Sequence, residues 1–291
     1  AQELVTSTWS DNTNSLNVAF TSSVQASFNT ATSSGQFYIE VFNKPPSDST
    51  AEVQYAIAYG HRAGSGSPDF TNDTGSFGLR AARVIYNQYR QLHFNDDSKL
   101  FTFGNHTPDS IYVININRAR YKQRLTLGSL NLQISGSVVA NSYAGGCVSV
   151  TDGGCGGGTI YLTDDSVTNG QTADSNLGPV YNIVSGSSGV LSGSNTNQVV
   201  INGSSSTFGN FYPEAGIIIL NADAFSGSLH PHATASTADK NHETMLRHIS
   251  AVGNDIGQNN TGSFIIDTTE EINSQFYFVR ARNNQFNYTN N

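Results

Sequence analysis

Charged residues are scarce in this chain of 291 residues, where Lys, Arg, Asp and Glu together make up 12% of the sequence. An ordinary globular protein carries about a quarter. Intrinsic disorder usually combines low hydrophobicity with high net charge, whereas hydrophobic residues make up 37% of this chain. The composition therefore argues against a disordered protein and favours a folded one.

Long apolar runs and an excess of basic charge are also missing. No run approaches the roughly 18 apolar residues that a membrane-spanning helix requires. The start of the chain lacks the basic stretch followed by an apolar core that marks a signal peptide. The formal net charge is −8 at pH 7, which disfavours general binding to nucleic acid. We therefore expect no membrane partner and regard nucleic acid as an unfavoured one.

Cysteine occurs twice, at Cys147 and Cys155, inside the glycine-rich stretch AGGCVSVTDGGCGGG. Two cysteines do not make the disulfide framework of a small secreted domain. Two states fit the pair equally well: a disulfide that closes a hairpin tip in an oxidising environment, or two free thiols in a cytoplasm.

Motifs for nucleotide binding and for hydrolysis are absent. None of the four lysines follows a glycine, so GxxxxGK[ST] does not occur, and neither do GxGxxG and GxSxG. Glycosidases need two carboxylates that face one sugar across about 5–9.5 Å. Adjacent pairs do not provide this, because neighbours on a strand point to opposite faces. Three such pairs occur: Asp96-Asp97, Asp164-Asp165 and Glu270-Glu271. We expect no enzyme and no cofactor.

Alternating apolar patterns are what the chain does contain. They predict strands over 37–42, 110–125 and 130–136, while 51–62 is apolar on both faces and fits either a buried strand or a short helix. Apolar residues at spacings of three and four predict a helix over 79–94. Residues 35–136 are therefore predicted to form one α+β domain.

A second β-rich region is predicted over 159–291, after a glycine-rich insertion at 137–158. Short strand patterns alternate there with Ser, Gly and Asn turns, as in a small barrel or sandwich. One helix is predicted near 238–252, and strands are predicted to close the chain over 264–288. Residues 1–34 are polar and predict an extended N-terminal arm.

The predicted fold class is mainly β with a few helices (α+β). It consists of antiparallel β-sandwich or small-barrel domains that carry the extended N-terminal arm.

Histidines gather in one part of the sequence and form a weak metal candidate. Four of the seven lie within 19 residues: His230, His232, His242 and His248. An extended segment would put His230 and His232 on one side, as a ligand pair requires. His242 begins an HExxH-like pattern, but Leu246 stands where the second histidine must be. A solvated histidine-rich loop and helix is the plain alternative, so we expect no metal.

Basic residues are unevenly distributed. Nine of the 14 lie between Arg62 and Arg124, against five Asp and no Glu in that stretch. Four alternate along the end of a predicted strand and would form a basic row on one face: Arg118, Arg120, Lys122 and Arg124. We interpret the row first as a subunit contact on an acidic neighbour. Contact with DNA and a solvated edge strand that discourages aggregation stay open.

Three blocks of the sequence together resemble virion structural proteins of large contractile-tailed phages, notably myoviruses of the cyanophage type. They are FYIEVFNKPPSDSTAEVQYAIAYGHRAGSGSPDF with its continuations IYNQYRQLHF and IYVININRARYKQRL, then FGNFYPEAGIIILN, then FYFVRARNNQFNYTNN. The resemblance covers roughly 35–136 and 205–291, leaves the insertion at 137–158 unmatched, and supplies no catalytic residue. In that family the NNQFNY block runs on into a further segment, so a continuation after Asn291 is expected.

The resemblance implies a non-enzymatic virion subunit of the tail or baseplate, or of the neck. Such a subunit would assemble in the host cytoplasm through contacts with other virion proteins and with copies of itself. Head decoration is an alternative place. A carbohydrate- or receptor-binding tail component is an alternative function, for which a glycan is the partner. Its aromatic platforms would be Tyr143, Tyr161, Phe208 and Phe211.

Overall fold

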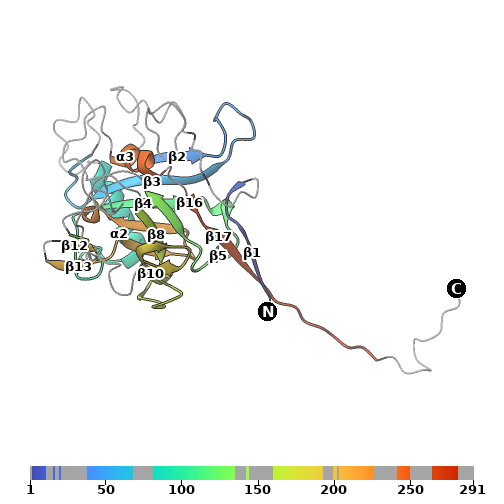
Figure 1. Cartoon of the computed structure of the whole chain (residues 1–291). Coiled ribbons are helices and arrows are strands. Elements are labelled where there is room, and N and C mark those ends of the chain that lie inside the picture. The colour runs from blue at the N-terminus through green and yellow to red at the C-terminus, as the bar shows by residue number, and fades with distance from the viewer. Residues whose placement is uncertain are drawn as a thin grey trace.

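Antiparallel strands dominate the protein (Figure 1). The computed structural model describes residues 2–10, 16, 20, 38–67, 81–134, 142–143, 160–192, 199–201, 203–225, 241–249 and 264–280. Two α-helices accompany the strands within these residues, α2 (Ala81–Phe94) and α3 (Asn241–Ile249). The predicted fold class, mainly β with a few helices, is confirmed. No helix within these ranges is long and apolar enough to cross a membrane.

One large sheet forms the centre of the protein, and it curls into a half-barrel. Its strands follow the order β16-β6-β8-β10-β14-β15-β4-β3-β2, and β9 and β11 also pair with β10. In chain order these strands are β2 (Tyr38–Phe42), β3 (Val53–His61), β4 (Ser110–Ile116), β6 (Asn131–Ile134), β8 (Ile160–Asp164), β9 (Ala173–Ser175), β10 (Gly178–Ser187), β11 (Val190–Leu191), β14 (Gly209–Tyr212), β15 (Ile217–Asn221) and β16 (Phe264–Ile265). The ambiguous segment 51–62 is thus a strand.

The large sheet joins the two regions that the sequence divides at 137–158. β4 pairs with β15 in antiparallel register, from Ile111 opposite Asn221 to Asn115 opposite Ile217. All five residues of β15 are buried, and such an apolar run needs a neighbouring strand on each side and cover on both faces. Strands of both predicted domains therefore share one sheet and one core.

A short sheet contains the described part of the glycine-rich insertion. β7 (Ser142–Tyr143) pairs with β12 (Val199–Ile201), which pairs with β13 (Ser204–Ser206). Cys147 and Cys155 lie outside the described residues, so their pairing stays a prediction.

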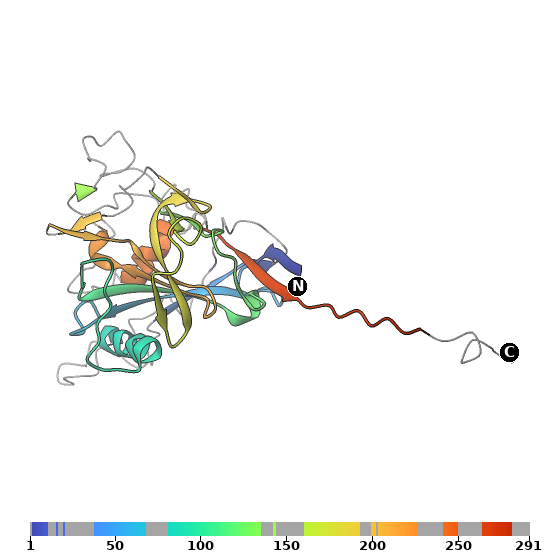
Figure 2. The same ribbon diagram turned by 90° about the horizontal axis from the view of Figure 1, so that it is seen from below.

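Each face of the large sheet has its own apolar cluster, because successive strand residues point to opposite faces. On one face Ile111 and Val113 of β4 pack with Tyr86 of α2. On the other face Tyr112 and Ile114 belong to a cluster that includes the apolar side of α3. The helices predicted over 79–94 and 238–252 are thus confirmed as α2 and α3, and in Figure 2 they lie on opposite sides of the sheet.

The described residues of the predicted N-terminal arm lie against the body. β1 (Gln2–Ser7) pairs with β17 (Asp267–Ile272), and β17 pairs with β5 (Arg124–Leu125) in a separate sheet. Trp9 is buried, and its indole N–H donates to the carbonyl of Phe264 at 2.8 Å. Burying a tryptophan stabilises this position strongly, so these residues form a strand and an anchor rather than a projecting arm.

Residues 118–124 differ from the strand that the alternation predicts. β4 ends at Ile116, and Arg118–Arg120 form a 3-10 helix, η2, before β5 begins at Arg124. Asn117 stops the strand, because its side-chain oxygen accepts the N–H of Ala119 at 3.0 Å and its carbonyl accepts that of Arg120. The basic residues consequently do not share one strand face.

Candidate functional site

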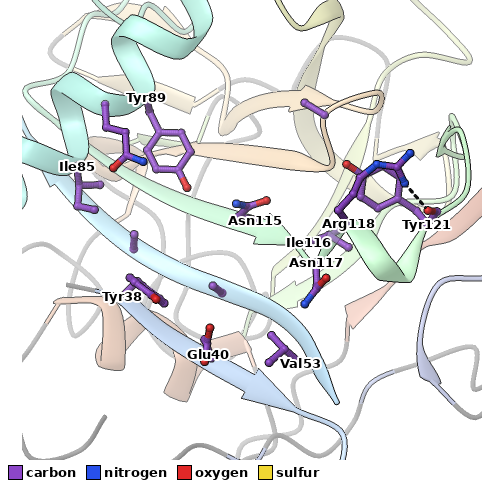
Figure 3. Close-up of a pocket in the computed structure, with 14 residues that line it drawn as sticks. Tyr38, Glu40, Val53, Ile85, Tyr89, Asn115, Ile116, Asn117, Arg118 and Tyr121 are labelled. Atoms are coloured by element: carbon purple, nitrogen blue, oxygen red, sulfur yellow. Dashed lines mark hydrogen bonds between the residues drawn. The ribbon is translucent and has the colours of Figure 1, made fainter. Parts of the chain in front are cut away.

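A groove of about 570 Å³ opens on the sheet face that carries α2 (Figure 3). Its floor consists of Ala56 and Ala58 of β3 and Asn115 of β4. On the same face of β4, Ile111 and Val113 are buried against the cluster under α2, whereas Asn115 is exposed. The groove therefore begins where the apolar cover of α2 ends, and small side chains leave its floor open.

The near walls come from β2 and α2. Tyr38 and Glu40 extend from β2 and Tyr89 from α2 (Figure 3). Gln88 of α2 also lines the groove. Burial raises the pKa of Tyr89, and a hydrogen bond with the Asn115 side chain opposes that rise. The Tyr89 phenol thus stays protonated at neutral pH. Tyr38 has 39% of its side-chain surface exposed at the rim.

The far wall is built by η2 and the residues beside it. Arg118 donates to the carbonyl of Tyr121 at 2.7 Å, and its guanidinium carbon lies 4.6 Å from the centre of the Tyr121 ring. This ring packs on Gly216, where an added Cβ would come within 2.6 Å of the ring and where φ is +68°. Only glycine suits both conditions. The contacts hold the Arg118 head at the end of the groove.

The charges that line the groove balance. Among the described lining residues, Glu40 is the one carboxylate and Arg118 the one cation, while the other polar groups are tyrosines and the amides of Gln88, Asn115 and Asn117. Amides and phenols both donate and accept hydrogen bonds. The arrangement can therefore bind a neutral ligand that carries many hydroxyl or amide groups beside an apolar face.

The predicted subunit-contact residues are mostly engaged within the chain. Arg120 donates to Glu52 Oε2 at 2.7 Å and also contacts the Ser10 hydroxyl, and Arg124 lies 3.3 Å from Glu3 Oε1. These pairs fasten the N-terminal residues to the body. The Lys122 side chain is exposed. A contact of this stretch with a neighbouring subunit stays a prediction.

Only two of the four predicted metal-ligating histidines lie within the described residues. His230 and His232 lie outside the described residues, while His242 is buried in α3 and His248 is half-buried there. Within the described part of the chain, no three potential metal ligands come together.

The prediction of an exposed aromatic platform for a glycan is wrong at two of its four positions. Phe208 and Phe211 are fully buried in the core, because β14 lies in the middle of the large sheet. Tyr161 on β8 is 45% exposed. The side chain of Tyr143 lies outside what the structure describes.

The pair Asp164-Asp165 holds loops and does not face a cleft. Asp164 accepts the N–H of Gly128 at 2.8 Å, and Asp165 accepts that of Asn182 at 2.9 Å. Both side chains are buried, and burial raises the pKa of the Asp164 carboxyl. Their role is structural, since both carboxylates accept backbone N–H groups of neighbouring segments.

A second functional feature is the segment of residues 273–280, which we call the exposed segment. It follows β17 and leaves the body, as Figures 1 and 2 both show. The exposed fractions of its apolar side chains are 85% for Phe276, 82% for Tyr277, 99% for Phe278 and 91% for Val279. The strand predicted for these residues is not formed. The sequence signal for this segment is the run FYFV, which is apolar at four successive positions. Such a run is typical of a segment whose two faces are both covered.

Comparisons of the chain with models of protein families, with curated proteins and with solved structures found no match.

Proposed function

We propose that this protein is a non-enzymatic structural subunit of a phage virion, placed in the tail or baseplate, or in the neck, and that it assembles through contacts with neighbouring subunits. The observation that carries the proposal is the nearly complete exposure of Phe276, Tyr277, Phe278 and Val279. Folded monomers rarely expose a contiguous apolar patch of this kind unless it binds a partner. The phage setting rests on the resemblance of the sequence blocks.

The exposed segment suits addition to a sheet. In an extended chain Phe276 and Phe278 point to one side, and Tyr277 and Val279 to the other. A partner must therefore cover both sides to bury the four side chains. Burying each large apolar side chain stabilises the contact by about 1.5–3 kcal/mol. Strand addition supplies main-chain hydrogen bonds as well as pockets for alternate side chains.

A receiving edge lies close to the base of the exposed segment. Within the described residues, β1 is one of the two edge strands of the sheet β1-β17-β5. Leu4 and Val5 of β1 and Ile272 of β17 are apolar and about half exposed. Edge strands are templates for pairing with another chain. We place the exposed segment of one copy against β1 of the next copy.

The described lining of the groove holds a single carboxylate, Glu40, whereas glycoside hydrolysis uses two carboxyl groups on opposite sides of the bond. The buried pair Asp164-Asp165 lies outside the groove lining. A binding or assembly role needs no such pair of carboxyl groups.

The assembly part is tested by light scattering after size-exclusion chromatography. The double variant Phe276→Ser/Phe278→Ser keeps the chain length and removes the two rings. We expect the wild type to form oligomers and the double variant to be monomeric, with unchanged thermal unfolding of the body. Tyr161→Ser removes an exposed ring elsewhere and should assemble as the wild type does. Equal oligomer size in the wild type and the double variant would refute the proposal.

The virion part needs a separate measurement. Antibodies raised against the folded body should label purified phage particles at the tail, baseplate or neck in electron micrographs. Labelling of the capsid would support the head-decoration alternative instead. Particles that contain no copy of the chain by mass spectrometry would contradict the virion role.

A further inference from the structure

We infer that the groove between α2 and η2 binds a neutral saccharide unit. The inference goes beyond the assembly role and does not depend on the exposed segment. Its volume of about 570 Å³ lies within the range of about 300–1,000 Å³ that small-ligand sites occupy. Such a volume accommodates one or two sugar rings.

The floor of the groove carries a polar side chain that the fold does not require. Asn115 is exposed although β4 is an inner strand, paired with β3 on one side and β15 on the other. An apolar residue there would continue the row of Ile111 and Val113. The exposed Asn115 amide both donates and accepts hydrogen bonds, so it can pair with a ligand hydroxyl.

Aromatic rings flank this amide. Tyr38 stands at the rim with 39% exposure, while Tyr89 lines the near wall and Tyr121 the far wall (Figure 3). A pyranose ring has an apolar C–H face and a rim of hydroxyl groups, and the apolar face packs on the flat surface of an aromatic side chain. Tyr38 would lose exposed surface when a sugar ring covers it.

The polar groups suit hydroxyls and not phosphates or carboxylates. Glu40 accepts, Arg118 donates, and the amides of Gln88 and Asn117 do both. Among the described lining residues the charge of Arg118 is offset by that of Glu40, so the groove offers no net positive charge to an anionic ligand. Arg118 is in addition held by the Tyr121 carbonyl. The chemistry therefore favours a neutral, many-hydroxyl ligand.

The test uses the full chain and a panel of neutral hexasaccharides built from glucose, mannose, galactose or N-acetylglucosamine. Saturation-transfer NMR identifies any binder, and isothermal titration then measures its affinity. We expect at least one neutral sugar to bind, and glucose 6-phosphate to bind more weakly than glucose. No signal from any neutral sugar, or a preference for the phosphorylated one, would overturn the inference.

Variants locate the binding. Tyr38→Ala and Asn115→Leu should each weaken the affinity at least about tenfold, which equals about 1.4 kcal/mol, while Tyr38→Phe should keep most of it because the ring remains. Tyr161→Ala removes a ring of similar exposure outside the groove and should change nothing. Circular dichroism confirms that each variant folds. Binding that survives both groove variants, or that depends on Tyr161, would contradict the assignment.

Discussion

Aromatic side chains have two contrasting surroundings in this protein. Under α2, Tyr86 and Phe101 meet edge to face with ring centres 5.4 Å apart, and both are fully buried. In the exposed segment, Phe276 and Phe278 extend into solvent. The residue types are alike, but only the first group has elements of its own chain to cover it. The body thus completes its own core, whereas the apolar side chains of the exposed segment are left uncovered by the described residues. In the proposed assembly a neighbouring subunit would cover them.

The largest expected effect compares one ring from each surrounding. Phe101→Ala leaves a cavity in a packed cluster and should lower the free energy of unfolding by about 3–5 kcal/mol. Phe278→Ala, measured in dilute monomeric protein, should change it by less than about 0.5 kcal/mol. Urea unfolding followed by Trp9 fluorescence measures both. Similar losses in the two variants would mean that the segment packs on its own body.

A smaller effect is expected from a titratable group, His93, among the buried rings under α2. His93 lies in the last turn of α2 among aromatic rings, and its ring centre is 4.1 Å from that of Tyr212. Neither of its ring nitrogens has a hydrogen-bond partner among the described residues. Burial lowers the pKa of His93 from 6.5 to about 3. In the unfolded chain the imidazole takes up a proton as the pH falls below about 6.5. The folded protein does not take up that proton until the pH approaches about 3, so stability is lost as the pH falls through this window.

We expect this one group to cost about 2 kcal/mol between pH 7 and pH 5. His93→Phe fills the same space without a titratable group. Its unfolding free energy should therefore fall less over that interval than that of the wild type. Parallel urea titrations at the two pH values measure the difference. Equal pH dependence in the two proteins would show that His93 is solvated or paired.

The smallest effect is expected for the basic residues Lys122 and Arg124. The Arg124–Glu3 pair is exposed, and such pairs contribute about 0–1 kcal/mol. Arg124→Gln should therefore hardly change the unfolding free energy. Lys122→Gln should leave it unchanged but weaken assembly at low salt if this stretch docks on an acidic neighbour. Sedimentation velocity at two salt concentrations measures the assembly. An unchanged sedimentation profile would show that Lys122 takes no part in the subunit contact.

Local patterns were sufficient for the regular elements. The spacing of Ile85, Tyr86 and Tyr89 predicts α2, and the alternation from Ile111 to Ile116 predicts β4. The alternation continues to Arg124, yet the strand stops, because the Asn117 side chain offers the backbone another hydrogen-bond partner. That competition is local, and the polar residue at the end of the apolar run was its signal.

The site could not be predicted in the same way, since it depends on distant segments. Ala58, Tyr89 and Asn115 become neighbours only through the β3–β4 pairing and the place where α2 ends. The single sheet depends likewise on the pairing of β4 with β15, about a hundred residues apart. No local sequence signal distinguishes Phe208, which is buried, from Phe278, which is exposed. Composition therefore indicated aromatic sites but not which rings face solvent.

Amide hydrogen exchange of residues 273–280 tests the central claim most directly. The full chain is measured by mass spectrometry in dilute solution, where it is monomeric, and again at a concentration where it assembles. The account predicts that these amides exchange freely in the dilute sample and become protected together with those of β1 in the concentrated one. Free exchange in both samples, with oligomers present in the second, would contradict assembly through the exposed segment.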